Sequence, residues 1–297
     1  FFEALYWNID DPIIKLGPIP GSSDRTALFE SDEYYREYRF DRLQGLEMTH
    51  PLVRIKDCAV KYDTNFLSAR DVSFCMKISE SQARPMLMKL SNQGFLTYDY
   101  NTDEILIKDR LFNYILAKSE QRDYDVIQFN SSLERRDQTD NNATLNLLNY
   151  DMTINGIKKI FLSDSHNVFL RPAGRTIILK KNRDFTFSGI INAGRFEFFC
   201  RDNSFSYDDF KIDMPNVDSL RLSVEVGQKD EYGRRKRRRV RTVIENITGE
   251  LLIDRPGNKS GLESLSEYPI FKSLEDSYVF YQDRKSTRLN SSHQIIS

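Results

Sequence analysis

The stretch DFTFSGIINAGRFEFFCRDNSFSYDDFKIDMPNVDSLRLSVEV, residues 184–226, decides the fold class of this chain. Apolar and polar residues alternate along it, most regularly where Leu220 and Leu222 alternate with Arg221 and Ser223. Alternation with a period of two is typical of strands that bury one face and expose the other to water. We therefore predict a succession of β-strands over this stretch.

The same period extends in both directions, so that residues 124–282 read as a β-rich domain of short strands separated by turns. An aromatic residue recurs at inward positions of several strands, at Phe187, Phe198, Phe205 and Phe210. Two architectures fit such a series, a β-sandwich and a β-solenoid. Tight Asn-Gly hairpin turns are rare here, which favours the solenoid.

Residues 50–118 show a helical period instead. Pro51 suits the first turn of a helix that His50 caps, and Ser68 is placed to cap a second helix. Ser79 begins a third helix in a capping box with Gln82, and Gly94 ends it. Two short strands then follow over residues 95–108 and predict a hairpin.

Three helices followed by a hairpin resemble a winged helix-turn-helix domain. The phrase ISESQARPMLMKLSNQGFL, residues 78–96, is similar to the turn, recognition helix and first wing strand of that family. The resemblance implies a third helix that places polar and basic side chains on DNA. Here those candidates are Gln82, Arg84 and Lys89.

The charges of this region favour a packing module over a DNA reader. Only two of the candidate side chains are cationic, and Asp99, Asp103 and Glu104 on the wing would repel phosphate. Pro85 also falls inside the third helix, where it lacks a donor and is expected to kink the axis.

The remaining segments complete an α+β chain. Residues 1–30 are predicted as an extended N-terminal segment, and residues 31–49 as a linker helix that begins at Ser31. Residues 283–297 resemble a translated sequencing adapter, so we expect the natural sequence to differ beyond Gln282. Because Phe1 is not Met, we also expect the natural protein to begin before Phe1.

The strongest charge feature is the run Arg234, Arg235, Lys236, Arg237, Arg238 and Arg239. Six adjacent cations can attract phosphate, RNA or an anionic membrane surface. Because the run lies between two predicted strands, a solvated loop is the favoured interpretation. The formal net charge of the whole chain is only −1, so no global attraction for nucleic acid is expected.

Cysteine and histidine usage argues against a disulfide framework, a metal site or a cofactor. Cys58, Cys75 and Cys200 lie far apart and are interpreted as small buried apolar residues; reduced thiols of this kind favour the cytoplasm, although the sequence leaves the compartment undetermined. His166 has Asp164 and Ser165 beside it, but neighbours in sequence cannot form a catalytic relay, so we predict a capped turn.

The whole sequence up to residue 282 resembles segments of long uncharacterised bacterial β-repeat proteins, which implies architecture and no activity. We expect no catalytic residues and no transmembrane segment. The first hypothesis is a non-enzymatic scaffold, part of a longer chain, whose repetitive β surface binds a protein partner. The alternative is a nucleic-acid-binding protein that uses the winged helix and the polybasic run. A polysaccharide hydrolase comes third and would need Asp202, Asp208, Asp209 and Asp213 to cluster.

Overall fold

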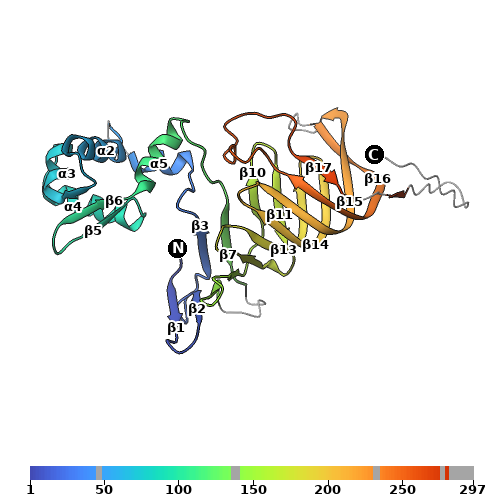
Figure 1. The fold of residues 1–297 in the computed structure, drawn as a ribbon, viewed down its shortest axis with the longest axis horizontal. Coiled ribbons are helices and arrows are strands. Elements are labelled where there is room, and N and C mark those ends of the chain that lie inside the picture. Colours follow the sequence, from blue (N-terminus) through green and yellow to red (C-terminus); the bar gives the residue numbers. More distant parts are fainter. Residues whose placement is uncertain (45–48, 135–140, 230–234, 275–277, 281–297) are drawn as a thin grey trace, which may run out of the picture. The chain divides into compact units, whose positions relative to one another are not determined.

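The computed structural model of the chain describes residues 1–44, 49–134, 141–229, 235–274 and 278–280, with the backbone alone within 224–246 and at 278–280. The fold is α+β, and the β-ladders between its described strands are antiparallel. The chain divides into two compact units (Figure 1). Unit 1 comprises residues 1–30 and 127–297, and unit 2 comprises residues 31–126.

Unit 2 contains the α-helices and a small sheet. Its helices are α1 (Glu37–Gln44), α2 (Pro51–Tyr62), α3 (Ala69–Met76), α4 (Glu80–Asn92) and α5 (Asp109–Lys118). Its strands are β4 (Phe66–Ser68), β5 (Leu96–Asp99) and β6 (Glu104–Ile107), which pair in the order β4-β6-β5.

Local signals in the sequence fix the ends of the helices. His50 Nδ1 accepts a hydrogen bond from the Leu52 N–H at the start of α2 (3.2 Å). At α3, the Asp71 N–H donates to Ser68 Oγ (3.1 Å), while the Ser68 N–H donates to Asp71 Oδ2 (2.8 Å). Gly94 follows α4 with a φ of +80°. Since these caps satisfy backbone groups that helix ends leave without partners, the predicted caps at His50, Ser68 and Gly94 are confirmed.

Three elements of unit 2 differ from the prediction. α1 begins at Glu37 rather than at Ser31, because Tyr34 forms an isolated bridge with Asp125 and the Tyr35 N–H donates to Asp125 O (3.0 Å). The strand β4 is not among the predicted elements, because it is too short to show a period. The helix α5 is not among them either, because it follows a strand directly and has no side-chain cap at Lys108 that would mark its start.

The core of unit 2 forms where the apolar faces of the helices meet the small sheet. Its fully buried side chains include Leu52, Ile55, Val72 and Leu87. The His50 ring lies against this core, stacked on Phe40 with 3.7 Å between ring centroids, and burial lowers the pKa of His50 below its usual value. None of the described helices combines the length and apolar character needed to cross a membrane.

Cys58 of α2 and Cys75 of α3 form a disulfide, with their Cα atoms 5.8 Å apart. The prediction of two reduced thiols is therefore wrong, because the two apolar helix faces that carry them face each other in the fold. Because two of the three thiols are oxidised, cysteine usage no longer favours the cytoplasm. Cys200 is a buried free cysteine as expected, and burial raises its pKa to about 12.

Unit 1 consists almost entirely of strands, which range in length from three to 19 residues. They are β1 (Ala4–Trp7), β2 (Ile13–Gly17), β3 (Thr26–Glu30), β7 (Gln128–Ser132), β8 (Ala143–Asn146), β9 (Met152–Ile154), β10 (Ile160–Ser163), β11 (Val168–Pro172), β12 (Ile177–Leu179), β13 (Phe185–Ala193), β14 (Phe196–Ser206), β15 (Lys211–Lys229), β16 (Arg235–Leu252), β17 (Ile270–Ser273) and β18 (Tyr278–Phe280), with the 3₁₀ turn η1 (Ala173–Arg175).

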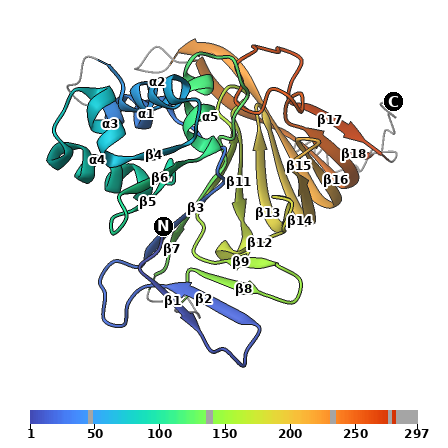
Figure 2. The ribbon, with the colours of Figure 1, turned by 60° about the vertical axis from the view of Figure 1, so that its left-hand side comes forward.

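Most of these strands form one 13-stranded sheet with the order β1-β2-β8-β9-β12-β13-β14-β15-β16-β17. Three further strands belong to this sheet. β11 pairs with β13, β10 pairs with β11, and β18 pairs with β16. Figure 2 shows β11, β13, β14, β15 and β16 side by side. β3 and β7 form a separate two-stranded sheet.

The inward face of the large sheet forms the core of unit 1. Phe187, Phe198, Phe205 and Phe210 are all buried, which confirms the inward positions predicted for these four residues. Residues 1–30 differ from the prediction of a separate extended segment, because β2 pairs with β8 and β3 pairs with β7. Leu16 of β2 is buried in the same core, so this segment is part of the domain.

The disulfide predicts which thiols can be alkylated. In the unreduced protein, iodoacetamide should modify no cysteine in the native state and only Cys200 after denaturation, as measured by intact mass. The double variant Cys58→Ala/Cys75→Ala should lower the free energy of unfolding by about 3 kcal/mol, because the crosslink restricts the unfolded chain. Cys200→Ala is the control that keeps the crosslink. Alkylation of Cys58 and Cys75 in unreduced, denatured protein would contradict the disulfide.

His50 predicts a loss of stability in acid. Because its pKa in the folded state lies below the usual value of about 6.5, the unfolded chain takes up the proton first as the pH falls. The free energy of unfolding should therefore decrease as the pH falls through about 6.5 and below. Urea unfolding of the wild type and of His50→Asn, which keeps a capping side chain without a titratable group, measures this contribution. Equal pH dependence of the two proteins would exclude it.

Candidate functional site

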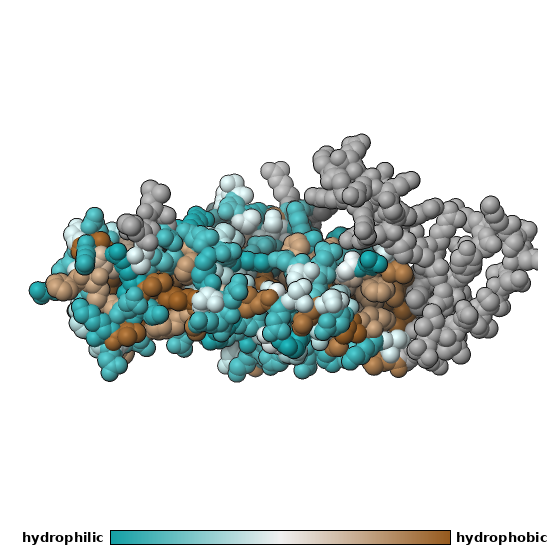
Figure 3. Space-filling model, turned by 90° about the horizontal axis from the view of Figure 1, so that it is seen from above, coloured by the Kyte–Doolittle hydropathy of each residue, from teal (hydrophilic) through white to brown (hydrophobic). Residues whose placement is uncertain are grey.

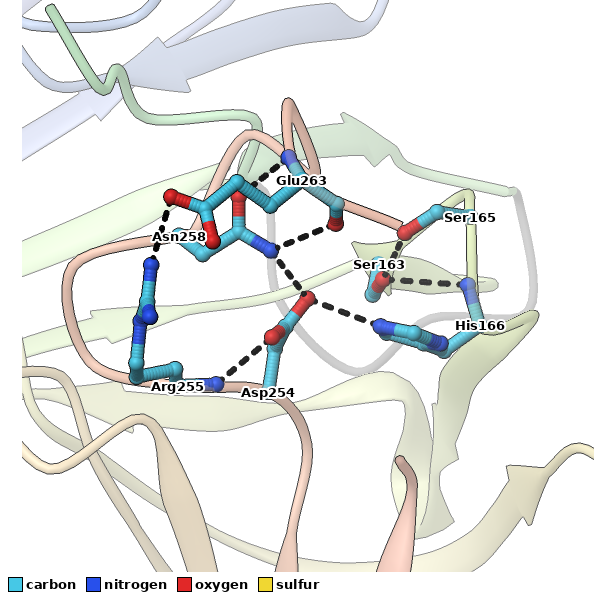
Figure 4. A network of polar contacts seen from close by, with 7 residues as sticks. All are labelled: Ser163, Ser165, His166, Asp254, Arg255, Asn258 and Glu263. Atoms are coloured by element: carbon cyan, nitrogen blue, oxygen red, sulfur yellow. Dashed lines mark hydrogen bonds and ion pairs between the residues drawn. The ribbon is translucent and has the colours of Figure 1, made fainter. Parts of the chain in front are cut away.

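A buried polar cluster of unit 1 joins the β10–β11 turn to the segment after β16 (Figure 4). Asn167 closes the turn with a φ of +53° and donates its N–H to Asp164 O (3.3 Å). The turn carries His166, whose Nε2 lies 2.8 Å from Asp254 Oδ2. The two side chains are 9% and 1% exposed, so this contact is shielded from water.

The Asp254 carboxylate has a full set of partners. Its Oδ2 also accepts from Asn258 Nδ2 (3.0 Å), and its Oδ1 accepts from the Arg255 N–H (2.6 Å). Asn258 in turn bonds both main-chain groups of Glu263, and Glu263 pairs with the Arg255 side chain (2.7 Å). Residues 254–263 are thus folded on themselves and fastened to the β10–β11 turn.

Gly261 shows how closely this segment approaches the turn. Its φ is +74°, and a Cβ at this position would lie 2.6 Å from Ser165 Oγ. A side chain would therefore meet both backbone strain and a steric clash.

The cluster contains the residue types of a catalytic relay but not its geometry. Ser163 Oγ accepts the main-chain N–H of His166 (3.3 Å) and lies 3.0 Å from Ser165 Oγ. A relay needs a serine hydroxyl bonded to the imidazole nitrogen opposite the carboxylate, whereas these hydroxyls bond each other and the backbone. The prediction of a capped turn at His166 is confirmed. Asp254 was not predicted as its partner, because the pair is separated by 88 residues and no local pattern connects them.

A surface pocket of about 320 Å³ adjoins Asp254. It is lined by Asp209, Lys211, Glu250, Leu252, Asp254, Pro256 and Tyr268. Lys211 Nζ lies 3.1 Å from both Glu250 Oε2 and Asp213 Oδ1. The bond to Glu250 raises the pKa of Lys211, and the same bond lowers the pKa of Glu250. These groups are held charged, which suits an ion-pair network better than proton transfer.

The carboxylates considered for a hydrolase have other partners in the fold. Asp213 pairs with Lys211, Asp202 Oδ2 accepts from Asn216 Nδ2 (3.3 Å), and Asp209 accepts from Ser206 Oγ (3.1 Å). Asp208 is exposed. Among the residues that the structure describes, no group of three or more His, Cys, Asp or Glu side chains could hold a metal ion.

The candidate nucleic-acid residues of unit 2 lie on α4, which runs as one helix through Pro85. Gln82 Oε1 accepts the Ser79 N–H (3.1 Å), so that it caps the helix. Arg84 forms an ion pair with Asp103 (2.6 Å) and lies 3.6 Å from Glu80. Lys89 is exposed. One of the two cations, Arg84, is therefore paired with a carboxylate of the β5–β6 hairpin.

The polybasic run is placed differently from the prediction. Arg234 lies outside the described residues, whereas Arg235, Lys236, Arg237, Arg238 and Arg239 belong to β16 and not to a loop. The backbone of β16 pairs Arg239 with Ser223, Arg238 with Val224 and Arg237 with Glu225 of β15. The reason is that β15 continues as a strand as far as Lys229, so the basic residues opposite it are paired as a strand as well. The tail at 283–297 also lies outside the described residues.

Comparisons with models of known families, with characterised proteins and with solved structures find no match to this chain. Function resides in the geometry of particular side chains and does not follow from the fold alone. In unit 1 that geometry shows a buried structural network and an ion-paired pocket.

The His166–Asp254 contact predicts a large loss of stability when its carboxylate is removed. Asp254→Ala should lower the free energy of unfolding by about 3 kcal/mol, because it leaves the buried imidazole and the Asn258 amide without their acceptor. Asp208→Ala removes an exposed carboxylate and should change the same quantity by less than about 0.5 kcal/mol. Urea unfolding followed by circular dichroism measures both. A similar small effect for the two variants would contradict a structural role for the network.

Proposed function

We propose that this chain is a non-catalytic scaffold module that binds a protein partner through exposed aromatic side chains of unit 2. The observation that carries the proposal is the pair Tyr62 and Phe74, whose residues are 41% and 73% exposed. Lys61 Nζ lies 5.4 Å from the centroid of the Tyr62 ring and 5.8 Å from that of Phe74, so both rings gather around one ammonium group. Exposed aromatic side chains at fixed positions are typical of interaction hot spots.

The two helices that carry this pair are crosslinked. Tyr62 ends α2, Phe74 lies in α3, and the Cys58–Cys75 disulfide joins the same helices. Ordering these side chains on binding therefore costs less entropy than it would on independent helices. Phe66 of β4 adds a further exposed ring on this unit. Figure 3 shows hydrophobic residues at the surface, among hydrophilic ones.

Unit 2 also supports the winged-helix proposal. Between α1 and α5, its elements run in the order α2, β4, α3, α4, β5 and β6, with β4 paired to β6, which is the arrangement expected of that family. The engagement of Arg84 by Asp103 favours its use as a packing and docking module over DNA reading. Solenoid-like stacking in unit 1 stays a proposal, supported by the succession of strands in one sheet. The antiparallel pairing of these strands favours hairpins over parallel coils.

Nucleic-acid binding is the second candidate, favoured by one observation in unit 1. The basic residues Arg235–Arg239 belong to a strand of the large sheet, so that their backbone has a fixed place beside β15. Cations on a rigid element bind phosphate with less ordering entropy than cations on a solvated loop.

The docking proposal predicts position-specific crosslinking. A photoreactive phenylalanine analogue at position 74 should give a discrete protein adduct in extracts of the source cells, because the native ring sits in the proposed contact. The same analogue at Tyr100, which is exposed on the β5–β6 turn, is the matched control. Adducts should be at least several-fold more abundant at position 74. Equal labelling at both positions, or none at 74, would contradict the proposed function.

A further inference from the structure

The outer face of the large sheet, across β10, β11, β13, β14 and β15, carries an unusual set of side chains. Side chains alternate between the two faces of each strand, so the neighbours of the buried Ile160, Leu170 and Phe198 point outward. The register aligns the outward residues in rows: Phe161 lies opposite Phe169, and Phe199 lies opposite Ile190, which is opposite Arg171. Figure 1 shows these strands side by side. We call this surface the outer face.

Three aromatic rings on the outer face each lie close to a cation. Lys159 Nζ is 4.0 Å from the centroid of the Phe161 ring and 3.4 Å from that of Phe169. Arg171 Cζ lies 5.4 Å from the centroid of Phe169, on the same ring. On β14 and β15, the Arg221 guanidinium lies 4.3 Å from the centroid of Phe199. Phe161 is 43% exposed, and the other two rings are half-buried.

Lys159, Arg171 and Arg221 form no ion pair within the described part of the chain, whereas the nearby Arg201 pairs with Asp218 (2.6 Å). Two carboxylates lie near these cations: the charge of Asp164 acts on Lys159, and the register places Glu197 opposite Arg221. Burial, and after it the charge of Arg171, lowers the pKa of Lys159 against the opposing charge of Asp164, so Lys159 and Arg171 repel each other beside Phe169. An anion bound at this point would relieve their repulsion.

The same sheet extends toward the polybasic run. β16 pairs with β15, and its backbone places Arg239 opposite Ser223, two residues along from Arg221. Cationic residues therefore occur on β11, β15 and β16 of one continuous sheet. An extended anionic polymer fits this distribution better than a single small anion does.

We propose that the outer face binds single-stranded nucleic acid, with bases stacked on Phe161, Phe169 and Phe199 and phosphates held by Lys159, Arg171 and Arg221. Unpaired bases supply planar faces for the rings, and the backbone supplies regularly spaced anions. An acidic peptide supplies the charge without the planar groups, and a duplex keeps its bases stacked inside. This binding is independent of the protein-docking function proposed for unit 2.

Fluorescence anisotropy of the full chain with a labelled 20-nucleotide oligo(dT) or oligo(U) tests the proposal. The double variant Phe161→Leu/Phe169→Leu keeps apolar side chains and should weaken binding about tenfold, because it removes the stacking surfaces. Lys159→Ala/Arg171→Ala should reduce the slope of log affinity against log salt by about 1.4. Arg201→Ala, which removes an ion-paired cation of the same face, is the control and should bind as the wild type does. Circular dichroism verifies the fold of each variant.

Several results would overturn the proposal. They are no binding of the wild type at low salt, equal affinity of the leucine variant, and equal or tighter binding of a 20-base-pair duplex, polyglutamate or vesicles containing phosphatidylserine. A loss of affinity confined to Arg84→Ala/Lys89→Ala would assign the binding to unit 2 instead. Stronger binding of single strands than of these competitors, with loss on substitution of the rings, supports it.

Discussion

Packing of phenylalanine rings around Phe185 is the contact on which the β-rich unit depends. The ring centroid of Phe185 lies 4.7 Å from that of Phe205 and 5.7 Å from that of Phe187, which joins β13 to β14. Phe129 of β7 meets Phe185 edge-on at 5.6 Å, so the small β3–β7 sheet is fixed to the large one through the same residue. Each ring buries a large apolar area and adds a directional contact, so this cluster favours the inward placement of the ring-bearing faces of β7, β13 and β14.

This constraint also determines where function can reside in unit 1. When one face of a strand is committed to the core, its other face can vary without loss of packing. The buried His166–Asp254 contact then fastens residues 254–263 to the β10–β11 turn, at the end of the strands rather than on their outer face. The core and the proposed binding surface thus occupy opposite faces of the same strands.

The elements that the sequence predicts well are those specified by neighbouring residues. The inward aromatic positions follow from a period of two, and the caps at His50, Ser68 and Gly94 follow from residue types at fixed offsets. Contacts between distant segments carry no such signal. The Cys58–Cys75 disulfide depends on how two helices face each other, and the partner of His166 lies after β16. The strand β4 is too short to show any period, so only its pairing with β6 reveals it.

The candidate binding residues show the same limit in electrostatic terms. Arg84 and Arg171 have the same chemistry, yet Arg84 is paired with Asp103 while Arg171 lies over Phe169 beside a second cation. The formal net charge of −1 conceals this difference, because it averages over both units. Screening confines the influence of an exposed charge to about 10 Å at moderate salt, so an anionic ligand responds to the local face and not to the total. Aromatic and basic residues at alternate positions, as in Phe169 and Arg171, are the one sequence signal that could have indicated this surface, provided that the strand period and the inward face were assigned first.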